Sequence, residues 1–310
     1  MDNIETWTRL LLIPSNLPYP IPVLWGGVIL LGFSIGILTG LFGVGGGFLV
    51  VPLLNVLLGV PYRIAVGSSL FFILGTSAIA LPGHIKEGNF EPKAVLYLSA
   101  GSILGAFFGD MAQDFLVSSV SLGNIAIFER WMHTLFLGLL TVTALLLVRP
   151  TSTLHTAHGE GTIRKNTLIQ ILPVPPYTRL DREGLSRVSI PGLLGIGFFI
   201  GTLTGLLGVG GGVLFMPVLL LVIGLRPKLA VGTSLGVVMA ASFAGLLKKL
   251  MGAQPKVSVP LTFLLLLGSI AGVQLGIRLF RRIESRRIRQ YFVIVILLAM
   301  GIVAWDLLVT

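Results

Sequence analysis

The sequence contains no cysteine and few charged residues. Without cysteine the chain has no disulfide, no thiolate chemistry and no cysteine-ligated metal site. Only 11% of the residues are charged, against a hydrophobic fraction of 54% and a mean hydropathy of +0.96. This balance is typical of chains embedded in a bilayer, where each spanning helix needs ~20 predominantly apolar residues. The composition therefore predicts an integral membrane protein.

Two further patterns are missing. The strict apolar/polar alternation of a membrane β-barrel does not occur, and the apolar residues form continuous runs instead. The first residues lack the basic start and uninterrupted apolar core of a cleaved signal peptide. Since helices satisfy their own backbone hydrogen bonds within lipid, we expect an all-α polytopic membrane protein.

The chain contains apolar segments that divide evenly between its two halves. Those of the first half are Val23–Leu41, Gly45–Leu58, Ile64–Leu81, Lys93–Met111 and Trp131–Val148. Those of the second half are Ile190–Leu207, Gly210–Ile223, Leu229–Leu247, Val257–Leu279 and Ile288–Leu308. The second segment of each half is too short to span, begins at a glycine cluster and contains a proline, Pro52 or Pro217.

An internal repeat relates the two halves. Gly32–Leu70 aligns with Gly197–Leu235 without a gap and with about half of the positions identical. Short, Gly/Pro-interrupted segments at matching places in two halves are a pointer to the binding site of a transporter. We expect a first transmembrane repeat over residues 1–149, a cytoplasmic linker over 150–189 and a second transmembrane repeat over 190–310.

The basic residues predict the topology. The net charge of +10 is better explained by Lys and Arg in cytoplasmic loops than by nucleic-acid binding. If all segments cross, most of the basic residues fall on one side, and both termini lie outside the cytoplasm. If the short segments return to their own side, the charges divide almost evenly. We therefore expect two inverted repeats of about five helical segments each, because an odd number of passes inverts the second repeat.

The glycine clusters are the candidate binding site. Gly45, Gly46 and Gly47 match Gly210, Gly211 and Gly212, and such a cluster at the start of a helix leaves N–H groups free to bind an anion. We expect the two clusters to face each other near the middle of the membrane. The alternative interpretation of a glycine is that it allows two helices to pack closely. We assign this role to four rows of glycines spaced four residues apart. These rows are Gly32, Gly36, Gly40; Gly197, Gly201, Gly205; Gly101, Gly105, Gly109; and Gly268, Gly272, Gly276.

Several hydroxyl side chains are duplicated beside the clusters and could donate to an anion, although such groups often bond to a carbonyl one turn back. The candidates are Thr39, Thr204, Ser69 and Ser234, with Thr76, Ser77 and Ser242 as weaker ones.

Other polar residues are sparse. Gln274 could reach a substrate, and His84 is a candidate for proton coupling or a simple interfacial histidine. Asp110 and Arg278 stand near segment ends, where snorkelling to the interface is expected. The sequence shows neither a cluster of residues with metal-ligand spacing nor a set of catalytic side chains, so we expect no cofactor, no metal and no enzyme activity.

The motifs GLFGVGGGFLVVPLL and GLLGVGGGVLFMPVLL, followed by AVGSSL and AVGTSL, resemble the TauE/SafE family. His84, Gly88 and Phe90 are similar to a further element of that family. The resemblance implies a carrier of sulfur-containing anions in a bacterial-type inner membrane, and the family name favours export.

Together these patterns predict a secondary transporter of a small oxyanion, sulfite, sulfoacetate or another organosulfonate, working by alternating access. An anion channel and a non-transporting membrane assembly or sensor protein are the alternatives. The expected partners are the anion and the lipid bilayer, and the oligomeric state stays open, with a homodimer as one option.

Overall fold

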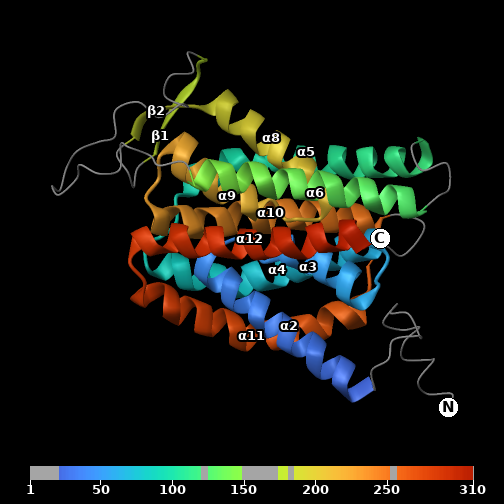
Figure 1. Ribbon diagram of the computed structural model, residues 1–310. Coiled ribbons are helices and arrows are strands. Elements are labelled where there is room, and N and C mark those ends of the chain that lie inside the picture. Colours follow the sequence, from blue (N-terminus) through green and yellow to red (C-terminus); the bar gives the residue numbers. More distant parts are fainter. Residues whose placement is uncertain (1–20, 120–124, 149–173, 181–184, 252–256, 310) are drawn as a thin grey trace.

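The computed structural model describes residues 21–119, 125–148, 174–180, 185–251 and 257–309, which are almost entirely helical (Figure 1). The first half forms α2 (Ile21–Phe42), α3 (Gly47–Pro52), the π-helical η1 (Leu53–Leu57), α4 (Tyr62–Lys86), α5 (Pro92–Ser119) and α6 (Ile125–Val148). The second half forms α8 (Ile190–Leu207), α9 (Gly212–Pro217), the π-helical η3 (Val218–Ile223), α10 (Pro227–Leu250), α11 (Val259–Arg282) and α12 (Ser285–Val309).

Every predicted apolar segment coincides with one of these helices. Of the helices in the described residues, 8 are long and apolar enough to cross a membrane, and the other two segments are the short ones at the glycine clusters. The all-α polytopic fold is thereby confirmed. Within the predicted linker, β1 (Tyr177–Leu180) and β2 (Leu185–Ser189) pair in an antiparallel manner and lead into α8. Linker residues 150–173 and 181–184 lie outside the described residues.

The two short helices are interrupted by their prolines. Proline has no N–H to donate to the preceding turn, and its ring crowds the carbonyl four residues back. Directly after Pro52 and Pro217 the α-helix widens into the π-helical segments η1 and η3. Each half therefore contains the same sequence of a long helix, a glycine loop and a short helix that changes its pitch.

The directions of the helices show that the repeats are inverted. The α2 and α11 helices run parallel, because Gly32 packs on Leu265 and Gly40 on Val273. The α4 helix also runs parallel to α11, since Gly75 and Gly83 contact residues 266 and 277 of α11 in the same order. With α2 and α4 in the same direction, the α3–η1 segment returns the chain to the face where α2 began. Each half thus makes an odd number of passes.

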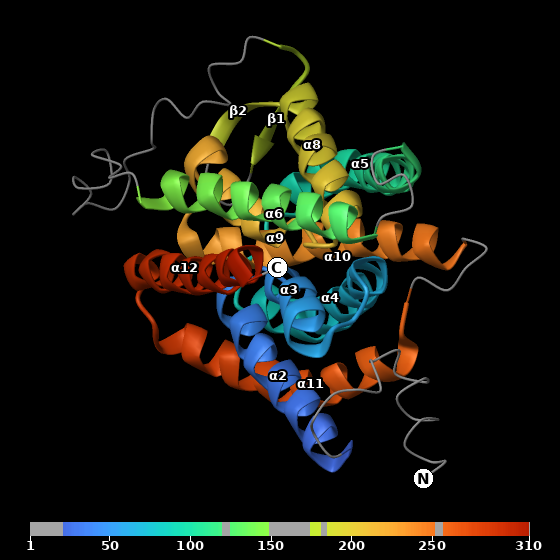
Figure 2. The same ribbon diagram turned by 45° about the vertical axis from the view of Figure 1, so that its right-hand side comes forward.

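The repeats are interleaved rather than packed as separate bodies. The α11 helix of the second half lies along α2, and α5 of the first half lies along α8. We call α2, α4 and α11 the first lobe and α5, α8 and α10 the second lobe, and α4 and α10 meet between them (Figure 2). The glycine rows make these contacts, because a Cβ at Gly36 or Gly201 would lie closer than 3.0 Å to the facing backbone. The packing interpretation of the rows is confirmed.

Hydrogen bonds repeat across the pseudo-twofold relation. The N–H of Ser258 donates to Ser68 Oγ, and the N–H of Glu91 donates to Thr233 Oγ1. Ser68 and Thr233 are equivalent in the AVGSSL and AVGTSL motifs, and Ser258 and Glu91 precede the equivalent helices α11 and α5. Residues of the two halves can therefore be compared position by position.

Candidate functional site

Two glycine loops, Gly43–Gly47 and Gly208–Gly212, connect the long helices α2 and α8 to the short helices α3 and α9. Their backbone conformations match: Gly43, Gly45 and Gly46 have φ of 69°, 71° and 74°. Equivalent residues of the second loop have φ of 69°, 71° and 71°. A side chain is strained in this left-handed region, so both loops require glycine here.

The glycine loops contact each other at the centre of the molecule. A Cβ on Gly47 would lie 2.7 Å from the Val209 carbonyl oxygen, and a Cβ on Gly212 would equally clash with the Val44 carbonyl. Both loops are fully buried and lie beside the middle of α4 and α10. The expectation that the two clusters face each other is confirmed.

The amides of Gly43 and Gly208 donate to the carbonyls of Thr39 and Thr204, whereas the last three amides of each loop are not used by the fold. Leu49 and Val50 donate to the Gly46 carbonyl and so begin α3, and α9 begins in the same way at Gly211. Within the described residues, the N–H groups of Gly45–Gly47 and Gly210–Gly212 donate to no acceptor. Buried N–H groups without an acceptor are rare in folded proteins, so these amides are candidates for binding a ligand.

Some of the predicted hydroxyl donors are already committed to protein carbonyls. Thr39 Oγ1 donates to the Ile35 carbonyl at 3.0 Å, and Thr204 Oγ1 donates to the Ile200 carbonyl at 2.9 Å. The Ser69 hydroxyl lies 2.6 Å from the Gly208 carbonyl, where it fixes the start of the second loop. A hydroxyl has one proton, so in this arrangement these three side chains have none left for an anion.

Other serines keep their protons free. Among the described residues, the buried Oγ atoms of Ser77, Ser242 and Ser234 have no hydrogen-bond partner. Ser77 Oγ lies 3.4 Å from the position of a Cβ on Gly45, and Ser242 Oγ is at the same distance from that of Gly210. Ser77 and Ser242 occupy equivalent positions on α4 and α10, so each glycine loop has one unused hydroxyl beside it.

Apolar side chains of α4 and α10 cover the two loops. The Ile73 methyl groups reach Gly45, Gly47 and Gly210, and Val238, the equivalent of Ile73, reaches Gly45. The Ile73 side chain therefore lies against glycines of both loops.

Two further predicted residues lie away from the loops. Gln274 is exposed on α11, so we leave it out of the site, and Arg278 is exposed on the same helix. His84 is buried: its Nε2 lies 3.1 Å from the Gly40 carbonyl, and its ring stands edge-on to Phe280 at 4.6 Å between centroids.

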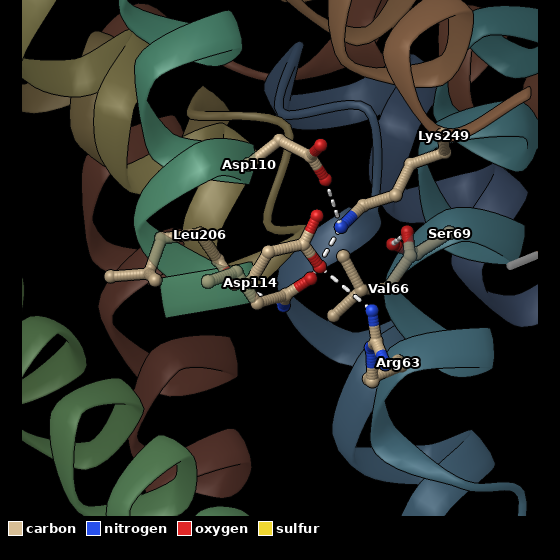
Figure 3. Close-up of polar contacts among 8 residues, drawn as sticks. Arg63, Val66, Ser69, Asp110, Asp114, Leu206 and Lys249 are labelled. Carbon is tan, nitrogen blue, oxygen red and sulfur yellow. Dashed lines mark hydrogen bonds and ion pairs between the residues drawn. The ribbon is translucent and has the colours of Figure 1, made fainter. Parts of the chain in front are cut away.

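A charged cluster that the sequence did not predict lies at the opposite end of the molecule from His84. Lys249 Nζ forms an ion pair with Asp110 and a hydrogen bond with Gln113 Oε1 (Figure 3). Beside them, Arg63 pairs with Asp114 at 2.7 Å. The expectation that Asp110 snorkels to the interface is wrong, because it is 1% exposed and neutralised by Lys249. We call these five residues the Lys249 cluster.

Sequence features that could have revealed this cluster were present. Lys249 occupies the position equivalent to His84 in the repeat, and Asp110 and Gln113 lie three residues apart on one helix face. Within the described residues, no group of three His, Cys, Asp or Glu side chains could hold a metal.

The comparisons with known proteins agree with this architecture. The profile of the family described as Sulfite exporter TauE/SafE matches residues 28–303. A probable membrane transporter protein of Methanocaldococcus jannaschii is 28% identical over 84% of this chain and 88% of its own length. The probable membrane transporter proteins YjnA and YunE of Bacillus subtilis are 29% and 27% identical, over 89% and 87% of this chain and 97% and 94% of theirs. No solved structure matches. The family and these relatives indicate a membrane transporter rather than an enzyme, and the chain belongs to the TauE/SafE family.

Proposed function

We propose that this transporter carries small sulfur-containing oxyanions, sulfite or an organosulfonate such as sulfoacetate, in the direction of export. The anion binds between the glycine loops, where it accepts hydrogen bonds from the amides of Gly45–Gly47 and Gly210–Gly212. The observation that carries this proposal is the presence of unused buried donors from both repeats around one centre. Ser77 and Ser242 contribute hydroxyls, and Ser234 supplies a further one.

Neutral donors suit an oxyanion that must also leave. Hydrogen bonds to a charged group contribute about 1.5–3 kcal/mol each, so several of them together compensate for the lost hydration of the anion. A fixed cation at the same place would hold the anion more strongly and slow its release. The family description, which names a sulfite exporter, supports the choice of sulfur oxyanions and of export.

Alternating access is the mechanism that fits two inverted repeats. Since α11 packs on α2 and α5 packs on α8, the bodies that rock are the two lobes rather than the two halves of the sequence. Their contact runs along α4 and α10, which carry Ile73 and Val238 over the glycine loops. Rocking about this contact would withdraw these side chains and expose the amides to one face at a time.

We further propose an inner-membrane location with both termini outside the cytoplasm. The end of the molecule that holds His84 carries most of the basic residues of the described loops and helix ends, including Lys86, Lys93, Arg226 and Arg282. Basic residues favour the cytoplasmic side, so the His84 end faces the cytoplasm and the Lys249 cluster faces outward.

The test removes the two equivalent hydroxyls. We expect the Ser77→Ala/Ser242→Ala double variant to bind sulfite and sulfoacetate more weakly by about tenfold for each hydroxyl lost, because each hydrogen bond to an anion contributes at least 1.4 kcal/mol. Binding is measured by calorimetry on purified protein.

The matched control is Ser102→Ala/Ser269→Ala. These serines are also buried and equivalent, but their hydroxyls donate to the carbonyls of residues 99 and 266 and lie in the helix contacts instead. Unchanged affinity in the first double variant, or an equal loss in both, would show that the anion binds elsewhere.

A further inference from the structure

One face of α11 changes from apolar to cationic before the helix ends. Leu267 and Ala271 are exposed on this face, and the exposed residues that follow them are Gln274, Arg278 and Arg282. Their spacing of three or four residues places all five side chains on one side of the helix. We call Gln274, Arg278 and Arg282 the α11 polar stripe.

The stripe lies on the outer surface of a membrane span. Val259–Arg282 is long and apolar enough to cross a bilayer, and the opposite side of the helix packs on α2 and α4. In both views α11 lies at the edge of the molecule (Figure 1 and Figure 2). With a rise of 1.5 Å per residue, Gln274 lies about 12 Å and Arg278 about 6 Å before Arg282. The stripe therefore occupies the depth at which a membrane changes from acyl chains to headgroups.

The side chains of the stripe have no partner within the residues that the structure describes. Gln274, Arg278 and Arg282 form no hydrogen bond or ion pair there. Arg281, which lies between the two arginines on the chain, pairs with Glu87 at the end of α4 instead. Two like charges one turn apart on a helix repel each other. An anion bound between the two guanidinium groups would remove this repulsion.

The other repeat shows that the fold does not require a polar surface at this place. The glycine rows align α5 with α11, and the positions of the stripe are occupied on α5 by Phe107, Met111 and Phe115. Met111 and Phe115 are 59% and 65% exposed, which suits side chains that face lipid. The same scaffold thus carries an apolar face on α5 and a cationic one on α11. The stripe is therefore better explained by a bound partner than by the packing of the helix.

We propose that the α11 polar stripe binds the headgroup of an anionic phospholipid, such as phosphatidylglycerol. The planar guanidinium groups of Arg278 and Arg282 donate paired hydrogen bonds to the phosphodiester oxygens. The Gln274 amide, one turn deeper, donates to the ester oxygens, and the acyl chains lie on Leu267 and Ala271. The order of side chains along this face matches the order of groups along a phospholipid. This inference is independent of the anion that the central site carries.

The experiment measures lipid binding to the purified full chain. Native mass spectrometry in detergent, with added phosphatidylglycerol or phosphatidylcholine of the same acyl chains, gives the dissociation constant of the first lipid bound. We expect the wild type to prefer phosphatidylglycerol by about 25-fold, about fivefold for each arginine. In Arg278→Gln/Arg282→Gln, we expect the two lipids to bind almost equally. Arg278→Met/Arg282→Phe, which copies the apolar face of α5, should lose the preference in the same way.

The matched control is Arg281→Gln/Arg287→Gln. These arginines are exposed at the same end of the molecule and their loss changes the net charge equally, but each has a carboxylate partner, Glu87 or Glu284. This variant should keep the preference of the wild type. Equal binding of both lipids by the wild type, or an equal loss of preference in this control and in Arg278→Gln/Arg282→Gln, overturns the proposal.

A second probe separates a lipid from free phosphate. Inorganic phosphate presents similar oxygens to the arginines but has no acyl chains to lie on Leu267 and Ala271. An excess of inorganic phosphate, added at constant ionic strength, should therefore leave phosphatidylglycerol bound to the wild type. Displacement of the lipid by inorganic phosphate overturns its assignment as the partner and makes the stripe a site for a small phosphate anion.

Discussion

The two ends of the transporter share a backbone plan but differ in their side chains. At one end the Lys249 cluster has two cations, Arg63 and Lys249, each paired with an aspartate. At the other end, the equivalent positions hold His84, Lys228, Ile277, Phe280 and Arg281. We call these five residues the His84 cluster.

The two clusters differ in net charge. In the His84 cluster, Lys228 Nζ lies 5.7 Å from the centroid of the Phe280 ring, and Arg281 is paired with Glu87. One positive charge thus remains, whereas the ion pairs of the Lys249 cluster cancel. The comparison teaches that the two repeats share a scaffold, while the side chains at its two ends give those ends different charges.

The largest effect on stability is expected at Lys249, where the two ends differ most. Lys249→Met would leave Asp110 buried without its cation, and we expect it to lower the free energy of unfolding by about 3–5 kcal/mol. His84→Met removes a hydrogen bond to the Gly40 carbonyl and an edge-on ring contact with Phe280 but leaves no buried charge, so the expected loss is about 1–2 kcal/mol. Thermal unfolding of both variants in detergent gives the comparison.

A second change confirms the cause. Adding Asp110→Leu to Lys249→Met should restore most of the stability, because the other repeat packs Ile277 at the place of Asp110. If the double variant is no more stable than Lys249→Met, the lysine is required for packing rather than for neutralising the aspartate.

A smaller effect on stability is expected at the glycine rows, where the two repeats should behave alike. Gly105 and Gly272 are equivalent, and a Cβ on either would fall within 3.0 Å of a carbonyl oxygen, that of Phe198 or Phe33. We expect Gly105→Ala and Gly272→Ala to destabilise the protein by similar amounts, about 1–3 kcal/mol, because each pushes apart a closely packed helix pair. Unfolding in denaturant measures both.

The control for this pair is Gly138→Ala. No atom lies within 4 Å of a Cβ at Gly138, so alanine there should be neutral or slightly stabilising in a helix. Unequal losses at Gly105 and Gly272 would mean that the two lobes do not depend on their glycine rows to the same extent.

The sequence was sufficient for the fold because the repeat itself carries it. The gapless alignment of Gly32–Leu70 with Gly197–Leu235 implies two matching series of helices, and glycines with positive φ can be recognised from their duplication. The packing of α5 on α8 and of α11 on α2, across the two halves of the sequence, was not predictable. Glycine rows with four-residue spacing indicate that a helix packs closely, but they do not identify its partner.

The site was only partly predictable for a geometric reason. Thr39 and Ser77 are both hydroxyl residues beside a glycine loop, but Thr39 reaches the carbonyl one turn back, and Ser77 remains without an acceptor among the described residues. That difference depends on side-chain rotamers, which the sequence does not specify. Asp110 and Lys249 come from different repeats, so their pairing also required the structure.

The smallest expected effect is a change in the KM on substitution of Lys228, at the His84 end. If that end faces the cytoplasm, its unbalanced charge attracts the anion before binding, and Lys228→Gln should raise the KM for sulfoacetate about threefold. The change should shrink as salt is added, because screening weakens the attraction over a Debye length of about 10 Å at 0.1 M. Inside-out vesicles present this end to the medium, and the initial rate of uptake gives the KM.

Two measurements control this prediction. Arg226→Gln removes an exposed cation at the N-cap of α10, two residues before Lys228, and it should leave the KM nearly unchanged. Right-side-out vesicles present the paired Lys249 cluster, so Lys228→Gln should have little effect on the KM measured there. An equal rise in both orientations would mean that Lys228 acts on the central site rather than on the approach of the anion. The asymmetry between the two ends would then concern only the ion pairs of the Lys249 cluster.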